Sequence, residues 1–184
     1  MTLETIVLAL ALVMIALIVW SSVRTGSPPT PTSPSVRRAM MTVLPDRLPG
    51  KDAASIVELG SGWGGVAFAL ARRYPHHSVI GYEVSFLPWA VSRLRLLVQP
   101  QTNLHFRNAD FMRVDLSGVA LSICYLMPVS MARLANKLSG EMPAGALVLS
   151  NTFAIPGWQP LDRRTASDLY RSPVFLYEIT ARRN

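Results

Sequence analysis

The sequence predicts a doubly wound α/β domain with a mostly parallel sheet, preceded by one long apolar helix. Short apolar runs that do not alternate with polar residues recur between residues 55 and 181, and amphipathic segments separate most of them. Strands that are apolar on both sides are typical of a parallel sheet with helices on both faces. Right-handed connections then give the doubly wound arrangement, in which ligands bind at the carboxyl ends of the strands.

The N-terminal segment is apolar along almost its whole length. Fifteen consecutive apolar residues run from Ile6 to Trp20. A helix that includes them spans about 30 Å, the thickness of the hydrocarbon core of a bilayer. A cleaved signal peptide is the alternative, but no Lys or Arg precedes the run and no A-x-A site follows it. We therefore expect one transmembrane anchor at residues 3–23.

Positive charge is confined to the chain after this segment, because all 18 Lys and Arg residues follow it, and the formal net charge is +7. This asymmetry favours a cytoplasmic location for the following domain, at the inner membrane if the chain is bacterial. Anionic lipid headgroups attract a basic domain, so the membrane is the expected partner. Nucleic acid is the rival partner, but the Arg residues are scattered without a basic run, which argues against nucleic-acid binding.

Residues 24–35 are expected to form a linker, since they include four prolines and no large apolar side chain. The domain then occupies residues 36–184. Helical patterns end before Pro45 and at Pro75, and Pro88 suits the first turn of a helix. We expect a short helix within residues 36–48 that ends before Pro45, and helices over residues 65–74, 87–98 and 129–138. Strands are expected over residues 55–59, 78–83, 103–110, 120–127, 145–153 and 173–181.

The glycine-rich stretch after the first strand has two interpretations. Gly60, Gly62 and Gly65 fit the G-x-G-x-x-G spacing of dinucleotide-binding proteins. Gly60, Gly62 and Gly64 fit the G-x-G-x-G spacing of methyltransferases that use S-adenosylmethionine (SAM). In both classes a glycine turn lets the backbone approach the ligand, while N–H groups of the next helix point toward it.

Three acids, Glu58, Glu83 and Asp110, end or follow the first three strands and help to distinguish the cofactors. Glu83 is placed to accept hydrogen bonds from ribose hydroxyls, which both cofactors predict. Glu58 lies two residues before the first glycine, where a carboxylate suits the cationic amino-acid end of SAM and repels a pyrophosphate. Asp110, followed by Phe111, suits an adenine amino group with an apolar neighbour against the ring. SAM is therefore the expected cofactor, ahead of NAD.

Three short segments resemble motifs I, II and III of class I SAM-dependent methyltransferases, which have a Rossmann-like fold: "VELGSGWGG", "GYE" and "NADF". The anchor and three longer segments resemble one branch more closely: "GYEVSFLPWAVSRLR", "YLMPVSMARLANKL" and "PAGALVLSNTFAIPGWQP". This branch is the small membrane-anchored protein-lysine methyltransferases, whose known members modify the ATP synthase c subunit and the adenine nucleotide translocase. The resemblance covers residues 55–160 and implies a prokaryotic relative that methylates lysine in a membrane-associated protein.

The resemblance also implies roles for individual positions. Contacts with SAM are implied for Glu58, Gly60, Gly62, Glu83 and Asp110, with Gly64 as the third glycine. A role on the substrate side is implied for Met127, Pro128, Phe153, Pro156 and Trp158. Tyr125, Phe153 and Trp158 are candidates for the lining of a lysine channel. No side chain stands out as a general base.

Two departures from the family pattern affect these expectations. Trp63 stands between the second and third glycines, where relatives often carry an acid, so the methionine end of the SAM pocket is expected to differ. The D/N-P-P-Y motif of many amino-methylating enzymes is absent, which argues against glutamine or adenine N6 as the methyl acceptor.

Other chemistry is less well supported. Cys124 is the single cysteine, within an apolar stretch, and the three histidines have no metal-ligand spacing, so no metal site is expected. Two alternatives to lysine methylation stay open. One is a membrane-associated methyltransferase of a quinone or lipid, and the other is a SAM-binding protein without catalysis.

Overall fold

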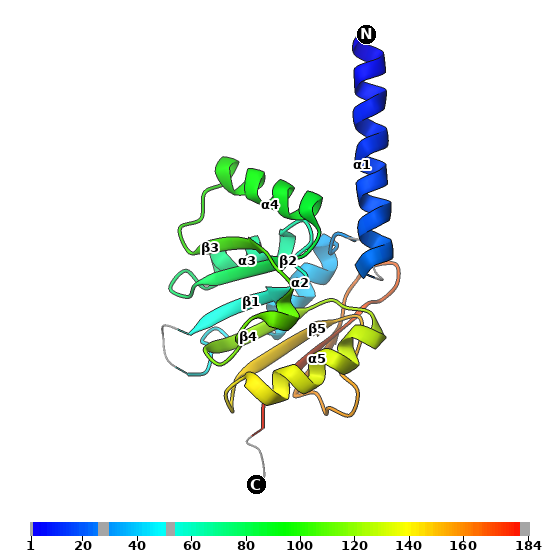
Figure 1. The fold of residues 1–184 in the computed structure, drawn as a ribbon. Coiled ribbons are helices and arrows are strands. Elements are labelled where there is room, and N and C mark those ends of the chain that lie inside the picture. Colours follow the sequence, from blue (N-terminus) through cyan, green and yellow to red (C-terminus); the bar gives the residue numbers. More distant parts are fainter. Residues whose placement is uncertain (1, 26–29, 51–53, 181–184) are drawn as a thin grey trace.

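A computed structural model describes residues 2–25, 30–50 and 54–180, and it contains a seven-stranded sheet (Figure 1). The strand order is β3-β2-β1-β4-β5-β7-β6. The first five strands in this order are parallel, and β7 is antiparallel to both of its neighbours. The strands are β1 (Ser55–Leu59), β2 (Val79–Glu83), β3 (Leu104–Asn108), β4 (Val119–Cys124), β5 (Leu147–Asn151), β6 (Asp162–Thr165) and β7 (Pro173–Glu178).

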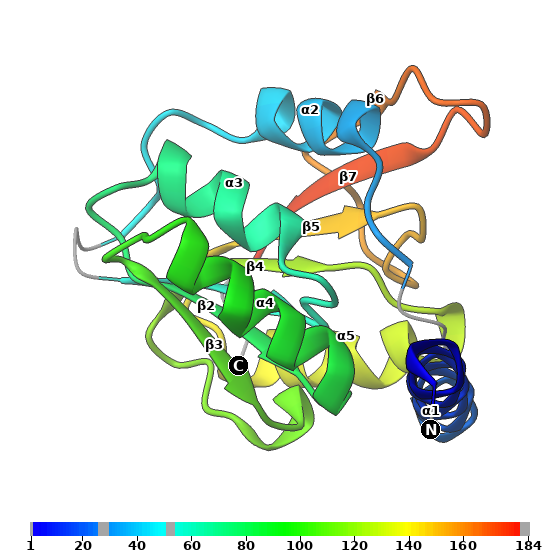
Figure 2. The ribbon, with the colours of Figure 1, turned by 90° about the horizontal axis from the view of Figure 1, so that it is seen from above.

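Helices cover both faces of the sheet. The helices are α1 (Leu3–Thr25), α2 (Pro34–Val43), α3 (Gly65–Arg73), α4 (Phe86–Val98) and α5 (Pro128–Glu141). Figures 1 and 2 show α2, α3 and α4 on one face and α5 on the other. Met40 and Phe68 belong to the buried cluster on the first face, and Met131 and Leu134 to the cluster on the second. The predicted doubly wound, mostly parallel sheet is therefore confirmed.

The helix and strand boundaries differ from the expected ranges by a few residues. α2 begins at Pro34 because Ser33 caps it, accepting a hydrogen bond from the Val36 backbone N–H at 3.3 Å. β4 ends at Cys124, so the expected strand over 120–127 is too long, and Tyr125 and Met127 lie in the loop that follows. The sequence pattern does not predict β6, whose residues Asp-Arg-Arg-Thr are polar and mostly exposed at the edge of the sheet.

The N-terminal apolar segment forms α1, which projects away from the domain (Figures 1 and 2). In the part of the chain that the structure describes, no helix combines the length and hydropathy needed to cross a membrane. The transmembrane anchor expected at residues 3–23 is therefore not supported. Part of that segment, including Leu10, Leu17 and Trp20, lies outside the side chains that the structure describes.

Candidate functional site

The predicted cofactor residues gather where the chain reverses its direction of winding across the sheet, between β1 and β4. β1 and β2 are adjacent and parallel, with Leu59 opposite Tyr82. The backbone N–H groups of Gly60 and Ser61 both donate to the Tyr82 carbonyl oxygen at 2.9 Å. The glycine loop after β1 is therefore held against the carboxyl end of β2, at the edge where a doubly wound fold binds ligands.

The backbone of the glycine loop distinguishes the two spacings. Gly60, Gly62 and Gly64 all have positive φ, whereas Gly65 is the first residue of α3 and does not. Gly64 has a second constraint, because a Cβ atom there would lie 2.7 Å from Cζ of Phe106. The three glycines with positive φ are those of the G-x-G-x-G spacing, so the loop follows the methyltransferase pattern.

Glu83 is the last residue of β2, and its buried carboxylate fixes the glycine loop. One carboxylate oxygen accepts from Gly62 N at 2.8 Å, and the other accepts from Ser85 N at 2.7 Å. A carboxylate has about four acceptor positions, so two backbone donors leave capacity for ligand hydroxyls. This geometry suits the expected contact with a ribose.

Glu58 is buried beside the start of α3, where its carboxylate accepts from Ala67 N at 2.8 Å. Burial raises the pKa of Glu58 to about 8; the Ala67 N–H opposes this shift, and the negative charge of Glu83 adds to it. In the ligand-free protein Glu58 is therefore mostly neutral at pH 7. A cationic ligand placed beside this carboxyl favours its ionised form, so the binding of such a ligand and the loss of the Glu58 proton are coupled.

Asp110 and Phe111 lie just beyond β3. Asp110 caps the short 3₁₀ helix η1 (Phe111–Arg113) by accepting from Met112 N at 2.9 Å, and its side chain stays about half exposed. Phe111 is half-buried against the core on the α5 face. Ala109 N donates to the Glu83 carbonyl oxygen at 3.2 Å, which places this turn next to the end of β2. The expected adenine contacts therefore share one edge with Glu58 and Glu83.

Three residues that the sequence interpretation did not single out also shape the loop. The Ser92 hydroxyl on α4 donates to the Gly62 carbonyl oxygen at 3.0 Å, and Asn108 donates to the Glu83 carbonyl oxygen at 2.8 Å. Ser61 lies in the loop itself, buried, and its Oγ has no hydrogen-bond partner among the described residues. A buried hydroxyl without a partner is unfavourable, which suits a site completed by a polar ligand. The Asn of "NADF" and the Ser of "GSG" were the available sequence signals.

The candidate acceptor side is formed by the loops after β4 and β5. Tyr125 follows β4 and stacks on Phe153, which follows β5, with ring centroids 6.2 Å apart and planes inclined by 12°. The loop after β4 also passes close to the glycine loop, since a Cβ atom on Gly60 would lie 3.4 Å from Leu126 Cδ2. Leu126, the residue after Tyr125, therefore lies beside the cofactor loop.

Met127 and Pro128 connect this loop to α5. The Met127 side chain is exposed, its residue is the N-cap of α5, and its carbonyl oxygen accepts from Met131 N at 3.0 Å. Pro128 occupies the first turn, where a missing N–H costs nothing. These two residues therefore begin α5 directly after the loop that carries Tyr125.

Pro156 and Trp158 belong to the loop after β5, and the structure places Trp158 away from the Tyr125–Phe153 pair. The chain turns at Gly157, which has positive φ, and Trp158 packs edge-on against Tyr177 of β7 at 5.8 Å. Trp158 also lines a depression with Glu178 and Ile179, beside the start of β5. Pro156 is exposed on the same loop. The structure therefore does not bring Trp158 into the channel lining expected from the sequence.

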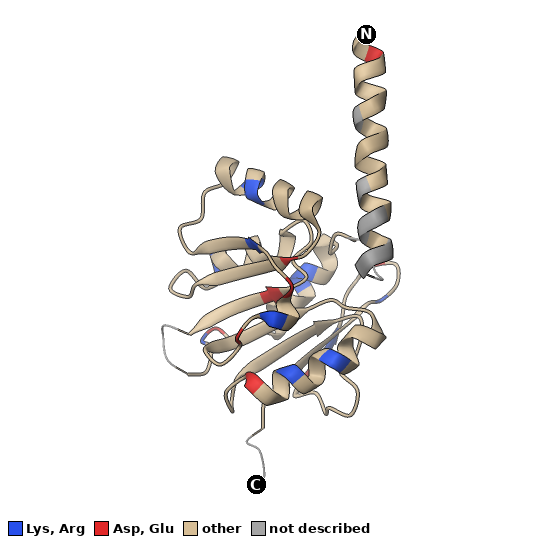
Figure 3. Cartoon of the chain, viewed as in Figure 1, with Lys and Arg blue, Asp and Glu red and all other residues tan. Residues whose placement is uncertain are grey.

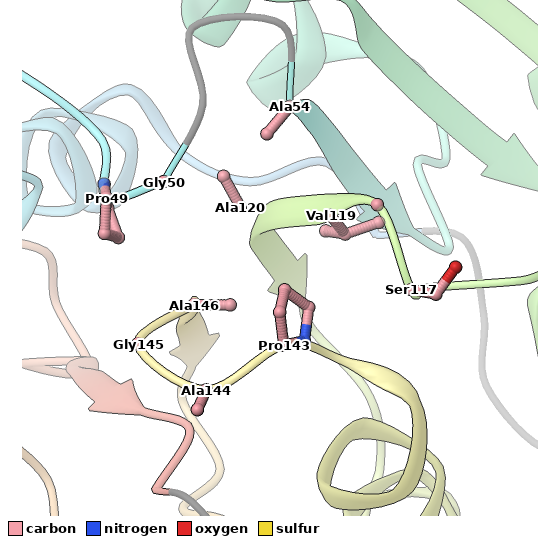
Figure 4. Close-up of a pocket in the computed structure, with 11 residues that line it drawn as sticks. Pro49, Gly50, Ala54, Ser117, Val119, Ala120, Pro143, Ala144, Gly145 and Ala146 are labelled. Carbon is pink, nitrogen blue, oxygen red and sulfur yellow. The ribbon is translucent and has the colours of Figure 1, made fainter.

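A separate cavity of about 470 Å³ lies at the amino ends of the parallel strands, away from the glycine loop (Figure 4). Its lining includes Ala54 before β1, Val119 at the start of β4, and Ala146 before β5. None of the described lining residues has a titratable side chain. The described part of the lining therefore offers no group for proton transfer, and the strand carboxyl ends remain the candidate site.

The sequence resembles a family of methyltransferases. The profile of the ANTKMT methyltransferase domain matches residues 58–162. The adenine nucleotide translocase lysine N-methyltransferase of Mus musculus is 32% identical over 134 residues, which cover 67% of this chain and 56% of that protein. The lysine N-methyltransferase of the ATP synthase c subunit, also from Mus musculus, is 30% identical over 135 residues, which cover 70% of this chain and 50% of that protein. The chain spans about half the length of these relatives.

Solved structures agree with the fold. An RNA methyltransferase from Salinibacter ruber, in complex with S-adenosyl-L-homocysteine, superimposes with a TM-score of 0.71 at 22% identity, covering 84% of this chain and 97% of that chain. TrmN from Thermus thermophilus superimposes with a TM-score of 0.63 at 15% identity, covering 86% of this chain and 51% of that chain. These similarities confirm the predicted class I methyltransferase fold.

Proposed function

This chain belongs to the family of the ANTKMT methyltransferase domain, and on that premise we propose that it transfers the methyl group of SAM to a lysine of a membrane-associated protein. The family confirms the prediction of a SAM-dependent methyltransferase. Lysine as the acceptor is supported by the names of the two relatives, which are both lysine N-methyltransferases.

The observation that carries the proposal is the aromatic pair after β4 and β5, because the loop that carries Tyr125 also places Leu126 beside Gly60. Tyr125 is partly exposed, and its ring is stacked on Phe153 where β4 and β5 end. A flat aromatic wall suits the aliphatic stem of a lysine, and the ring faces attract its ammonium group. A lysine that lies along these rings would lose part of its contact with water.

Methyl transfer needs alignment more than acid–base help. The glycine loop, Glu58 and Glu83 would hold SAM, which would supply an electrophilic methyl group on its sulfonium to the lysine nitrogen. The lysine must first lose a proton, and with a reference pKa near 10.4 only about one in a thousand is neutral at pH 7.4. An aromatic, poorly hydrated channel lowers the pKa of the lysine, because burial disfavours its charged form. The contribution expected of Tyr125 and Phe153 is therefore positioning and desolvation.

The acceptor can be tested with the full-length protein and SAM labelled in its methyl group. Membranes from a strain that lacks the gene serve as substrate, and the label is followed into protein and lipid fractions. Label in a protein band, mapped to lysine by mass spectrometry, supports the proposal. Label that enters only the lipid fraction contradicts it and favours a quinone or lipid acceptor.

Replacing Tyr125 by alanine is expected to lower kcat/KM for the protein substrate at least about tenfold, because the aromatic wall is lost. The affinity for SAM should stay unchanged, since Tyr125 lies on the acceptor side. Tyr125→Phe is the matched control, because it keeps the ring and removes only the hydroxyl, and it should retain most activity. Steady-state kinetics and calorimetric SAM titrations check both expectations. Equal losses in the two variants would point to the hydroxyl instead of the ring.

Membrane attachment through α1 is the second part of the proposal. Most large apolar side chains of α1 that the structure describes are exposed: Leu3, Ile6, Val7, Leu8, Leu12, Val13, Met14, Ile15 and Val19. Figure 3 shows an acidic residue on α1 close to the N-terminus, and Glu4 lies in this first turn. A helix that is apolar all round requires apolar surroundings. A single-pass arrangement with the domain in the cytoplasm is the finer form of this proposal.

Vesicle binding tests the attachment. The full chain is expected to co-sediment with vesicles of phosphatidylcholine and phosphatidylglycerol. The triple substitution Leu8→Gln, Leu12→Gln and Ile15→Gln is expected to lower the bound fraction at least about tenfold, because it removes three exposed apolar side chains from one side of the helix. Unchanged sedimentation of the triple variant would exclude α1 as the attachment.

A further inference from the structure

The outward face of α4 is an apolar surface that the methyl-transfer site does not use. Phe86, Leu94, Leu97 and Val98 are between 63% and 76% exposed, and Val91 is 37% exposed. Continuous exposed apolar surfaces of this kind commonly mark a site that binds another protein or a membrane. The remaining question is which partner covers it.

These five side chains form one continuous face of the helix. At 100° per residue, Val91, Leu94 and Val98 are neighbours on the helix surface, and Phe86 and Leu97 adjoin them. The opposite face holds α4 on the domain: Pro88 and Ser92 are buried, and Trp89 and Leu96 pack against the core. The outward face therefore takes no part in packing α4 onto the domain, and α4 is apolar on both sides.

The position of α1 indicates what lies over this face. α1 and α4 are in contact. In Figure 1, α1 projects from the side of the domain that α4 covers, and the view along α1 in Figure 2 shows α4 on the same near side. A bilayer that receives α1 would therefore lie against the outward face of α4.

The polar residue on this face is a cation. Arg93 is exposed and lies near Phe86 and Leu97 on the helix surface. A helix with an apolar face and an Arg at its margin suits the interface of a membrane with anionic lipids, where the side chain reaches the headgroups.

We propose that the outward face of α4 lies on an anionic lipid bilayer and fixes the orientation of the domain beside α1. This inference rests on the proposed attachment through α1.

The test is a fluorescent label at Leu97→Cys in the full chain, with Leu161→Cys as the control. Leu161 is 60% exposed and lies just before β6, at the sheet edge opposite β3. The native Cys124 is fully buried, so labelling should be confined to the introduced thiol. The probe is a phosphatidylcholine and phosphatidylglycerol vesicle with brominated acyl chains. We expect the label at position 97 to lose about half of its fluorescence through contact with these chains, and the label at position 161 to lose little.

The outcomes separate the two membrane proposals, because sedimentation of the same samples reports attachment independently. Co-sedimentation without quenching at position 97 overturns the α4 contact and leaves attachment by α1 standing. Equal quenching at both positions also overturns it. A spectral shift at position 97 without vesicles, growing with protein concentration, assigns the face to a second copy of the chain instead. Absence of co-sedimentation overturns both membrane proposals, and the lysine methylation assay remains unaffected.

Discussion

Replacing Glu83 by alanine is expected to weaken SAM binding at least about 100-fold, because each charge-assisted hydrogen bond to a buried carboxylate contributes roughly 1.5–3 kcal/mol. Two consequences act together. The ribose loses its acceptor, and the loop loses the carboxylate that binds Gly62 N and Ser85 N. Isothermal titration calorimetry with SAM measures the effect.

The control must be an acid that ends a strand elsewhere. Glu178 is the last residue of β7 and is exposed. It pairs with Leu147 at the start of β5, so it lies at the amino ends of the parallel strands, away from Glu83. Glu178→Ala is expected to leave the affinity for SAM unchanged. Circular dichroism and gel filtration show whether Glu83→Ala remains folded. A folded Glu83→Ala protein whose SAM affinity lies within about threefold of the wild type would remove Glu83 from the site.

The fold was predictable from the sequence because its central strands are buried on both faces. β1, β4 and β5 consist almost entirely of buried residues, so they appear as uninterrupted apolar runs. β6 offers no such signal. Its polar residues pair only with β7, and this pairing depends on backbone hydrogen bonds that leave no hydrophobic pattern.

The grouping of the candidate cofactor residues was predictable for a related reason. Parallel strands bring their carboxyl ends to one edge, so Glu58, Glu83 and Asp110 could be placed together from strand boundaries alone. The spacing of the glycines was ambiguous in the sequence, and the positive φ of Gly64 now supports G-x-G-x-G. The hydrogen bond from Gly62 N to the Glu83 carboxylate was not predictable, because it depends on the conformation of the loop.

The geometry of the candidate acceptor side was harder to predict, because this part of the molecule is built from loops. Tyr125 and Phe153 were both candidates, and their stacking depends on how the turns after β4 and β5 are folded. Trp158 had the same aromatic signal in the sequence. The turn at Gly157 places Trp158 against Tyr177 of β7. No local sequence pattern indicated this position.

A second large effect is expected from pH, through Glu58. Its carboxyl is buried, and its pKa is raised to about 8, so below this pH the neutral form predominates in the ligand-free protein. The proposed partner of Glu58 is the cationic amino-acid end of SAM, which binds the ionised form more tightly. Affinity therefore scales with the ionised fraction and falls as pH is lowered, by roughly 50-fold between pH 8 and pH 6.

The matched variant is Glu58→Gln, which cannot ionise but keeps an oxygen to accept from Ala67 N. It should bind SAM more weakly than the wild type at pH 8, and the two affinities should converge toward pH 6, where Glu58 is neutral. Calorimetric titrations at several pH values measure both curves. The variant retains the titration of SAM and of every other protein group, so only the difference between the curves reports Glu58. If the affinities of the two proteins depend on pH in the same way, the charge of Glu58 does not contribute to SAM binding. The role of Glu58 would then be limited to accepting the hydrogen bond from Ala67 N at the start of α3.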